Sequence, residues 1–407
     1  MERIIFSGRA ARLSARTFFV IIITLLVSCS KDNSAPRGKT DGTQELITKL
    51  DVAKMLSCLP MEQDHLNEVH GAATASSDNG YDEEYMMKDL LESPGAGVGD
   101  DAGTRAATRA KYSSPLRGLI QEYLSQHGTP VTRSGEMDVQ TYLDALASSG
   151  MQIYWPYSEQ WDGETYPLIT FDPGYGAESN YGYLLSMGED GKLKVDSVYV
   201  DENLAKTRPV WVVNSNDDSA YTPLELSIDN GSGPLSHSSG NLSVAGRKAS
   251  GMKNLYLKSF TMLRNYDSWF AGASEFWVKC GSVSGFKASI ETDLDRYTPS
   301  ITDMVIVVKR RDMGKSVPFH AILATDFTSQ MDKIAFLITE DDGGKSTSWN
   351  CSAVVKVNSK SYGFEMSIPY RQNDDIVWRG QLSAKYFNSS PEVTGRFGDV
   401  AVTFALE

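Results

Sequence analysis

The chain has 407 residues, of which 41% are hydrophobic, so it is long enough to bury a sizeable core and to form two or more domains. Its formal net charge of −13 argues against a nucleic-acid partner, because a phosphate backbone is bound by a basic surface. Four cysteines are too few to hold a scaffold together by disulfides.

Residues 1–28 have the pattern of a signal peptide. Several arginines precede the apolar run FFVIIITLLV, which is shorter than the roughly 20 residues that a membrane-spanning helix needs. The run ends in Leu26-Val27-Ser28-Cys29, which resembles a bacterial lipobox. That resemblance implies cleavage before Cys29 and attachment of lipid, including palmitate, at this cysteine. The alternative is an ordinary secretory signal in which the cysteine is incidental.

Residues 29–44 are rich in serine, asparagine, glycine, proline and charge, and this composition predicts a flexible tether. The signal and the tether resemble those of exported lipoproteins of the Bacteroidota. The resemblance, with Ser30 directly after the cysteine, implies a protein of the cell envelope that is anchored to the outer membrane through its N-terminal lipid. Whether it faces the periplasm or the cell surface stays open.

Residues 45–214 are predicted to form an α+β module. Apolar residues recur at helical spacing in three segments, and short strand-like runs follow them. Helices followed by antiparallel strands are typical of an α+β fold. The expected helices cover residues 51–59, 115–127 and 139–149, and the expected strands cover residues 152–155, 167–171, 183–187, 193–200 and 209–213.

Residues 215–251 are rich in serine, glycine and asparagine and are predicted to be a linker or a long loop. Residues 252–407 have the character of an all-β domain. Apolar and polar residues alternate along short runs, as at Phe276, Val278 and Cys280, and glycine-rich turns separate the runs. Roughly eight such runs suit a β-sandwich.

Acidic residues concentrate in two predicted loops of the sandwich. One loop region holds Asp267 and Glu275, and the other holds Glu340, Asp341 and Asp342. If both lie at one end of the sandwich, their carboxylates could converge on Ca²⁺, which takes six to eight oxygen ligands. This arrangement loosely resembles C2-like domains. The alternative is that these acids are solvated residues of hairpin turns.

Aromatic residues crowd the stretch 154–183. Flat rings with a polar edge can bind sugars and peptides, so a ligand surface built from Trp155, Trp161 and Tyr166 is one hypothesis. The other is ordinary packing of these rings in a core.

Two of the cysteines, Cys280 and Cys351, lie on predicted strands of the sandwich, and an exported protein meets an oxidising compartment. A disulfide between them is therefore one hypothesis. Cys58 is expected to be a buried helix residue, because a free cysteine behaves as a small hydrophobic residue.

No catalytic signature stands out in the sequence, since HExxH and GxSxG are both absent. We therefore expect a lipid-anchored protein of the cell envelope with a non-catalytic binding or structural role, whose partner is a glycan, a peptide or another envelope component. The alternative is a secreted hydrolase with a carboxylate or metal-dependent site.

Overall fold

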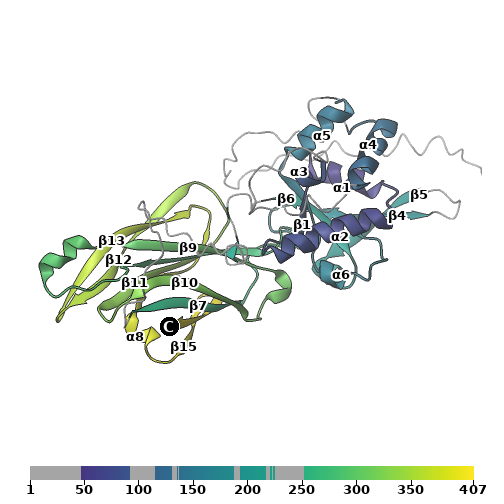
Figure 1. Cartoon of the computed structure of the whole chain (residues 1–407). Helices are drawn as coiled ribbons and strands as arrows, with labels where there is room; N and C mark the ends of the chain where they lie inside the picture. Colours follow the sequence, from purple (N-terminus) through teal and green to yellow (C-terminus); the bar gives the residue numbers. More distant parts are fainter. Residues whose placement is uncertain are drawn as a thin grey trace, which may run out of the picture. The chain divides into compact units, whose positions relative to one another are not determined.

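The computed structural model describes residues 47–91, 115–130, 135, 137–187, 193–216, 221, 223–224 and 252–407. The predicted signal peptide, Cys29 and the tether lie outside these residues. All of the described residues belong to one compact unit. This unit contains an α+β region followed by an all-β region (Figure 1), so the predicted fold class is confirmed. Among the described residues, no helix is long and apolar enough to cross a membrane.

The α+β region contains one six-stranded sheet with the order β1-β2-β6-β3-β4-β5. Its helices are α1 (Lys49–Ser57), α2 (Gln63–Asp78), α3 (Met87–Leu91), α4 (Pro115–His127), α5 (Val139–Ala147) and α6 (Glu202–Ala205). Its strands are β1 (Glu84–Met86), β2 (Met151–Tyr154), β3 (Leu168–Phe171), β4 (Ser179–Met187), β5 (Leu193–Asp201) and β6 (Val210–Ser215).

The strands of this sheet are antiparallel, except that β3 and β6 are parallel. The expectation of purely antiparallel strands is corrected at this pair. A parallel pair needs a long connection, and here the β4–β5 hairpin and α6 supply it.

Both faces of the sheet are buried at its central strand β6. On β6, Trp211 and Val213 pack into a cluster formed with the helices, whereas Val210 and Val212 lie in a separate cluster on the opposite face. This alternation follows from the period of two along a strand. Helices α1 to α5 cover one of these faces, whereas on the other α6 supplies only Leu204 and Ala205, so further apolar cover is needed there.

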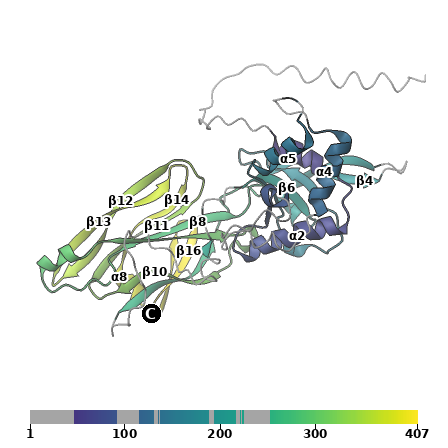
Figure 2. The ribbon, with the colours of Figure 1, turned by 45° about the horizontal axis from the view of Figure 1, so that its top comes forward.

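The all-β region consists of two sheets, with the orders β10-β7-β16-β15 and β13-β12-β11-β8-β9, and β14 pairs with β11. In Figures 1 and 2 the long strands β11, β12 and β13 run side by side. Its strands are β7 (Lys253–Met262), β8 (Ser274–Ser282), β9 (Ser300–Val308), β10 (Val317–Phe327), β11 (Met331–Glu340), β12 (Ser346–Val357), β13 (Lys360–Arg371), β14 (Asp375–Ser383), β15 (Glu392–Phe397) and β16 (Val400–Leu406).

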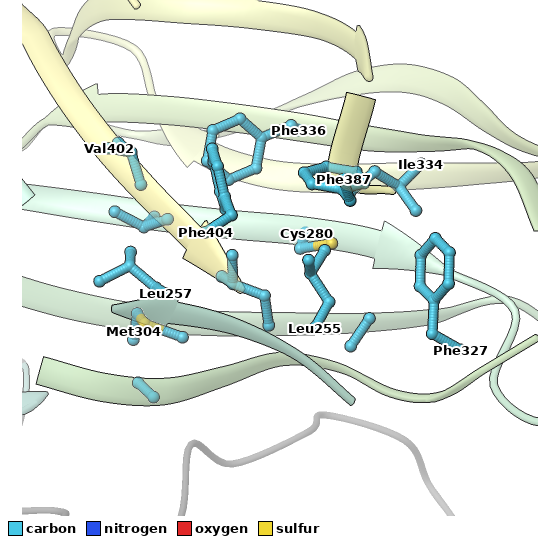
Figure 3. Packing of buried hydrophobic residues seen from close by; sticks show 14 of the residues in the cluster. Leu255, Leu257, Cys280, Met304, Phe327, Ile334, Phe336, Phe387, Val402 and Phe404 are labelled. Atoms are coloured by element: carbon cyan, nitrogen blue, oxygen red, sulfur yellow. The ribbon is translucent and has the colours of Figure 1, made fainter. Parts of the chain in front are cut away.

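The core of the sandwich lies between its two sheets (Figure 3). The alternation predicted for Phe276, Val278 and Cys280 is observed, because all three side chains are fully buried in this core. Phe336 on β11 packs edge-to-face against Phe404 on β16, with ring centroids 5.6 Å apart. Aromatic pairs with this geometry join the two sheets.

Most of the predicted linker 215–251 lies outside the described residues. Of its described residues, Ser215 ends β6, and Pro223 pairs with Val305 of β9 in a parallel bridge. Leu224 is 1% exposed and packs in the core of the sandwich. Pro223 and Leu224 of this segment are therefore packed against the all-β region.

Substitution of Phe336 by alanine is expected to lower the free energy of unfolding by about 3–5 kcal/mol, because it leaves a cavity between the two sheets. Ile376→Ala serves as the control, since Ile376 is 40% exposed on β14, and it should cost about 1 kcal/mol or less. Urea unfolding measures both values. Equal losses for the two variants would contradict the placement of Phe336.

Candidate metal centre

Three carboxylates meet where β8 begins and β11 ends. Glu275 is the second residue of β8, Glu340 is the last residue of β11, and Asp267 lies in the loop that joins β7 to β8. The two strands are antiparallel neighbours, with Glu340 opposite Phe276. Carboxylate oxygens of Asp267, Glu275 and Glu340 all lie within 4.8 Å of one another. The structure thus brings together acids from both predicted loops.

Glu340 is buried because of its place in the strand pattern. Ile334, Phe336 and Ile338 are the core-facing residues of β11, and Glu340 continues this alternation by two further residues. Its side chain therefore lies at the buried end of the strand, and the residue is only 1% exposed. A carboxylate in such a place needs a cation, a proton or hydrogen-bond donors.

The neighbouring acids line a small pocket. Its volume is about 160 Å³, and its lining residues are Tyr221, Asp267, Glu275, Asp341, Asp342, Gly343 and Arg371. No sequence pattern predicted that Tyr221 and Arg371 would belong to the site. Each comes from a segment far along the chain from the acids, so that only the fold brings them to the pocket.

Asp341 organises the turn beside the pocket. Its carboxylate accepts hydrogen bonds from the Gly343 amide at 3.0 Å and the Trp277 indole at 3.1 Å, and it pairs with Arg371 at 3.4 Å. Gly344 has φ = +92°, and a Cβ there would lie 2.9 Å from the Asn373 side chain. The turn therefore needs glycine at this position. The Asp341 carboxylate is therefore bound by protein groups, and its role is to fix the conformation of the turn beside the pocket.

Two carboxylate oxygens of the cluster lack a protein partner outside the cluster. The Asp267 and Glu340 side chains hydrogen-bond each other, which requires a proton shared between them. Within the described residues, Asp267 Oδ2 and Glu340 Oε1 are buried and accept a hydrogen bond from no protein group outside the cluster. Burial raises the pKa of Glu340, and the adjacent Asp267 raises it further. Burial also raises the pKa of Asp267. Both carboxyls thus resist carrying a negative charge unless a positive species compensates for it.

Asp342 extends the same negative field to the mouth of the pocket. Burial and the charge of Asp267 raise its pKa to about 6 from an ordinary value of 3.8. Two cations touch the acids of the cluster: Arg371 pairs with Asp341, and Arg310 Nη1 donates to the Asp267 carbonyl oxygen at 2.8 Å. The acids of the cluster outnumber these two cations.

The donor set indicates a particular class of cation. Asp267, Glu275 and Glu340 offer only oxygen atoms, and Asp342 lies near them along the pocket. Hard cations such as Ca²⁺ prefer carboxylates, carbonyls and water, whereas zinc is more often bound by cysteine and histidine. With bidentate carboxylates and water in the pocket, this set can supply the six to eight ligands of Ca²⁺.

The aromatic residues predicted to form a ligand surface do not form one together. Trp155 is 1% exposed, and its ring packs against His70, Trp161 and Trp211 at centroid distances of 5.4, 5.2 and 5.6 Å. This burial corrects the expectation that Trp155 is a surface platform. The indole of Trp161 is partly buried and donates to the Thr165 carbonyl at 2.9 Å.

Tyr166 is the most exposed of the three predicted ligand-binding residues, at 47%. Its hydroxyl donates to the Met61 carbonyl at 3.1 Å. The exposure of these two residues differs because of their places in the fold. Trp155 directly follows β2 and faces the helices, whereas Tyr166 lies in the connection before β3.

The hypothesis of a disulfide between Cys280 and Cys351 is also corrected. Both are free cysteines in the structure. Cys280 lies in the core between the two sheets, whereas Cys351 packs in a different cluster with Ile368 and Trp349. The two sulfur atoms are thus directed into separate clusters. Cys58, expected to be buried, is a half-buried free cysteine at the end of α1.

Comparison of the chain with protein-family models, with curated proteins and with solved structures found no match. What the chain does is therefore argued from the geometry of the acidic cluster and from the sequence.

The pH dependence of stability should report on Asp342. In EDTA, the free energy of unfolding is expected to fall as pH rises from about 4 to 6, because a carboxyl whose folded pKa is raised binds its proton more tightly in the folded state. Asp342→Asn should make this fall shallower. Urea unfolding across this pH range measures it.

The matched control is Asp295→Asn, since Asp295 is exposed and lies outside the pocket. It should leave the fall unchanged. Identical pH profiles of stability for wild type and Asp342→Asn would contradict the raised pKa of Asp342.

Proposed function

We propose that this chain is a lipid-anchored protein of the cell envelope that binds calcium through its all-β region and has a binding or structural role. The observation that carries the calcium proposal is the convergence of Asp267, Glu275 and Glu340, whose carboxylate oxygens lie within 4.8 Å of one another. The lipobox-like Leu26-Val27-Ser28-Cys29 supports the anchor. The partner is proposed to be a glycan, a peptide or another component of the envelope.

A shared proton is the main competitor of a cation at this cluster. One proton between Asp267 and Glu340 would neutralise one of their two charges, and the carboxylates of Glu275 and Asp342 would still add to the field. A divalent cation offsets two charges and coordinates several oxygens at once. It can also satisfy Glu340 Oε1, which has no protein donor once the proton shared with Asp267 is lost.

The size of the pocket favours an ion over an organic substrate. Its volume of about 160 Å³ is below the range of roughly 300–1,000 Å³ that is usual for pockets that bind small molecules. An ion with a few water molecules fits this space. The site also suits the modest calcium affinity of extracellular modules, with Kd values of about 10⁻⁴–10⁻³ M.

A carboxylate-dependent hydrolase is the second candidate. The observation that favours it is the pair of a carboxyl with a raised pKa and neighbouring acids in a pocket, which is also how a general acid is kept protonated. This function predicts hydrolysis of an ester, peptide or glycoside that is lost in Asp342→Asn. A screen of these substrate classes without turnover would remove it.

Calcium is expected to raise the melting temperature of the detergent-solubilised chain by several degrees relative to EDTA. At about 10 mM calcium, Kd values of 10⁻⁴–10⁻³ M correspond to about 1.4–2.7 kcal/mol of stabilisation, because only the folded chain presents the site. Thermal melts at pH 7.5 measure the shift. Glu275→Gln should abolish it.

Asp295→Asn again serves as the control and should keep the full calcium shift, since it removes a carboxylate that lies outside the cluster. A wild-type melt that is the same in EDTA and in calcium would remove the calcium proposal. So would a shift that Glu275→Gln retains in full.

The lipid anchor has its own test. Cys29→Ser should abolish incorporation of labelled palmitate and release the protein from the membrane fraction, because the acyl chains hold it there. Cys58→Ser is the matched control, since Cys58 lies in the α+β region, and it should behave as wild type. Palmitate labelling that persists in Cys29→Ser would contradict the assignment of this cysteine.

A further inference from the structure

The loop between β7 and β8, residues 263–273, covers the face of the α+β sheet opposite helices α1 to α5, where α6 alone contributes a helix. Its residues Trp269 and Phe270 are both 0% exposed, and their ring centroids lie 3.9 Å apart. They belong to one apolar cluster with residues from four strands of that sheet and two flanking segments: Tyr154, Tyr157, Leu168, Val200, Ala205, Val210 and Val212. A loop of the sandwich thus completes the core of the α+β region.

Hydrogen bonds hold the same loop to the α+β region. The Asn214 side-chain amide donates to the carbonyls of Phe270 and Ala271 at 3.1 and 2.6 Å. In the other direction, the Trp269 indole donates to the Glu178 carbonyl at 3.0 Å, and the Ala273 amide donates to Asp82 Oδ2 at 2.9 Å.

Gly272 allows the last of these contacts. Its φ is +137°, and a Cβ at this position would lie 2.5 Å from Asp82 Oδ2. The loop therefore approaches the carboxylate of Asp82 closely enough that only glycine fits. This register brings the chain from the buried Phe270 directly back to β8.

The segment that carries the two rings begins and ends at the acidic cluster, and residues 267 and 275 form the base of the loop. Asp267 lies two residues before Trp269, and Glu275 lies five residues after Phe270. Their carboxylate oxygens are within 4.8 Å of one another and of Glu340. The arrangement that inserts the two rings into the α+β sheet thus also forces these carboxylates together, and their mutual repulsion opposes it.

We propose that a divalent cation held by Asp267, Glu275 and Glu340 closes the base of the β7–β8 loop and so locks Trp269 and Phe270 into the α+β sheet. This inference rests on the calcium site proposed above. The cation replaces repulsion between the two ends of the loop with shared coordination, so occupancy of the site and insertion of the rings stabilise each other.

Other contacts join the two regions independently of the cation. Arg310 pairs with Glu202 at 2.9 Å, and Arg311 pairs with Glu159 at 2.6 Å and also with Glu83. Loss of the cation is therefore expected to loosen the loop locally, while these ion pairs keep the regions together. The readout must accordingly be local to residues 263–273.

Hydrogen–deuterium exchange of the detergent-solubilised full chain, in EDTA and in calcium, tests the lock. Calcium should slow exchange of peptides covering 268–275 by tenfold or more, because the Ala271 and Ala273 amides are bonded within and across the loop contact. Peptides covering β15 and β16, residues 392–406, should change by less than about twofold.

Calorimetric titration with calcium chloride accompanies the exchange measurement. Glu340→Gln should weaken calcium binding and make exchange of the loop the same in EDTA and in calcium, and Glu275→Gln serves the same purpose if the first variant does not fold. Asp295→Asn should behave as wild type, since it lies outside the cluster.

The outcomes separate this inference from the function on which it rests. Absence of calcium binding in the titration would overturn both. Calcium binding with unchanged exchange in 268–275 would leave the site in place and overturn the lock. Equal slowing in 268–275 and 392–406 would likewise overturn it, because that pattern reports general stabilisation of the sandwich.

Discussion

The six-stranded sheet of the α+β region must be covered on both faces, and this constraint governs the rest of the structure. Strand β6 carries Trp211 and Val213 on one face and Val210 and Val212 on the other, all fully buried. Helices α1 to α5 cover the first face. The second is covered by the short helix α6 and by Trp269 and Phe270, which belong to a loop of the sandwich. Because exposed apolar faces are costly in water, the α+β region depends on the sandwich for its core.

This dependence has an electrostatic consequence. The segment that carries Trp269 and Phe270 folds back on itself, because the Tyr266 amide donates to Ser274 Oγ at 3.2 Å. Asp267 and Glu275 flank the two rings, and Glu340 at the end of β11 lies beside them. Apolar burial in one region thus gathers carboxylates in the other. Two of the gathered oxygens, on Asp267 and Glu340, have no protein donor outside the cluster among the described residues.

A hydrophobic contact and a charged cluster on one short loop can therefore influence each other. Burial of the rings is favourable by itself, while the packed carboxylates are unfavourable until a proton or a cation joins them. The raised pKa of Glu340 has the same origin as the affinity proposed for calcium, since both follow from burial beside Asp267. The glycine at position 272 keeps the loop in the register that this coupling needs.

The sequence by itself determined the fold class, the buried alternation of Phe276, Val278 and Cys280, and the two groups of acids, because these depend on local periodicity and composition. Its composition could not place Trp155 or Cys351, whose burial and neighbours depend on which strands pair. Only the tertiary structure decided that the two acid groups meet and that Trp269 belongs to the α+β core. Both features depend on contacts between residues far apart in the chain, and local sequence patterns do not predict such contacts.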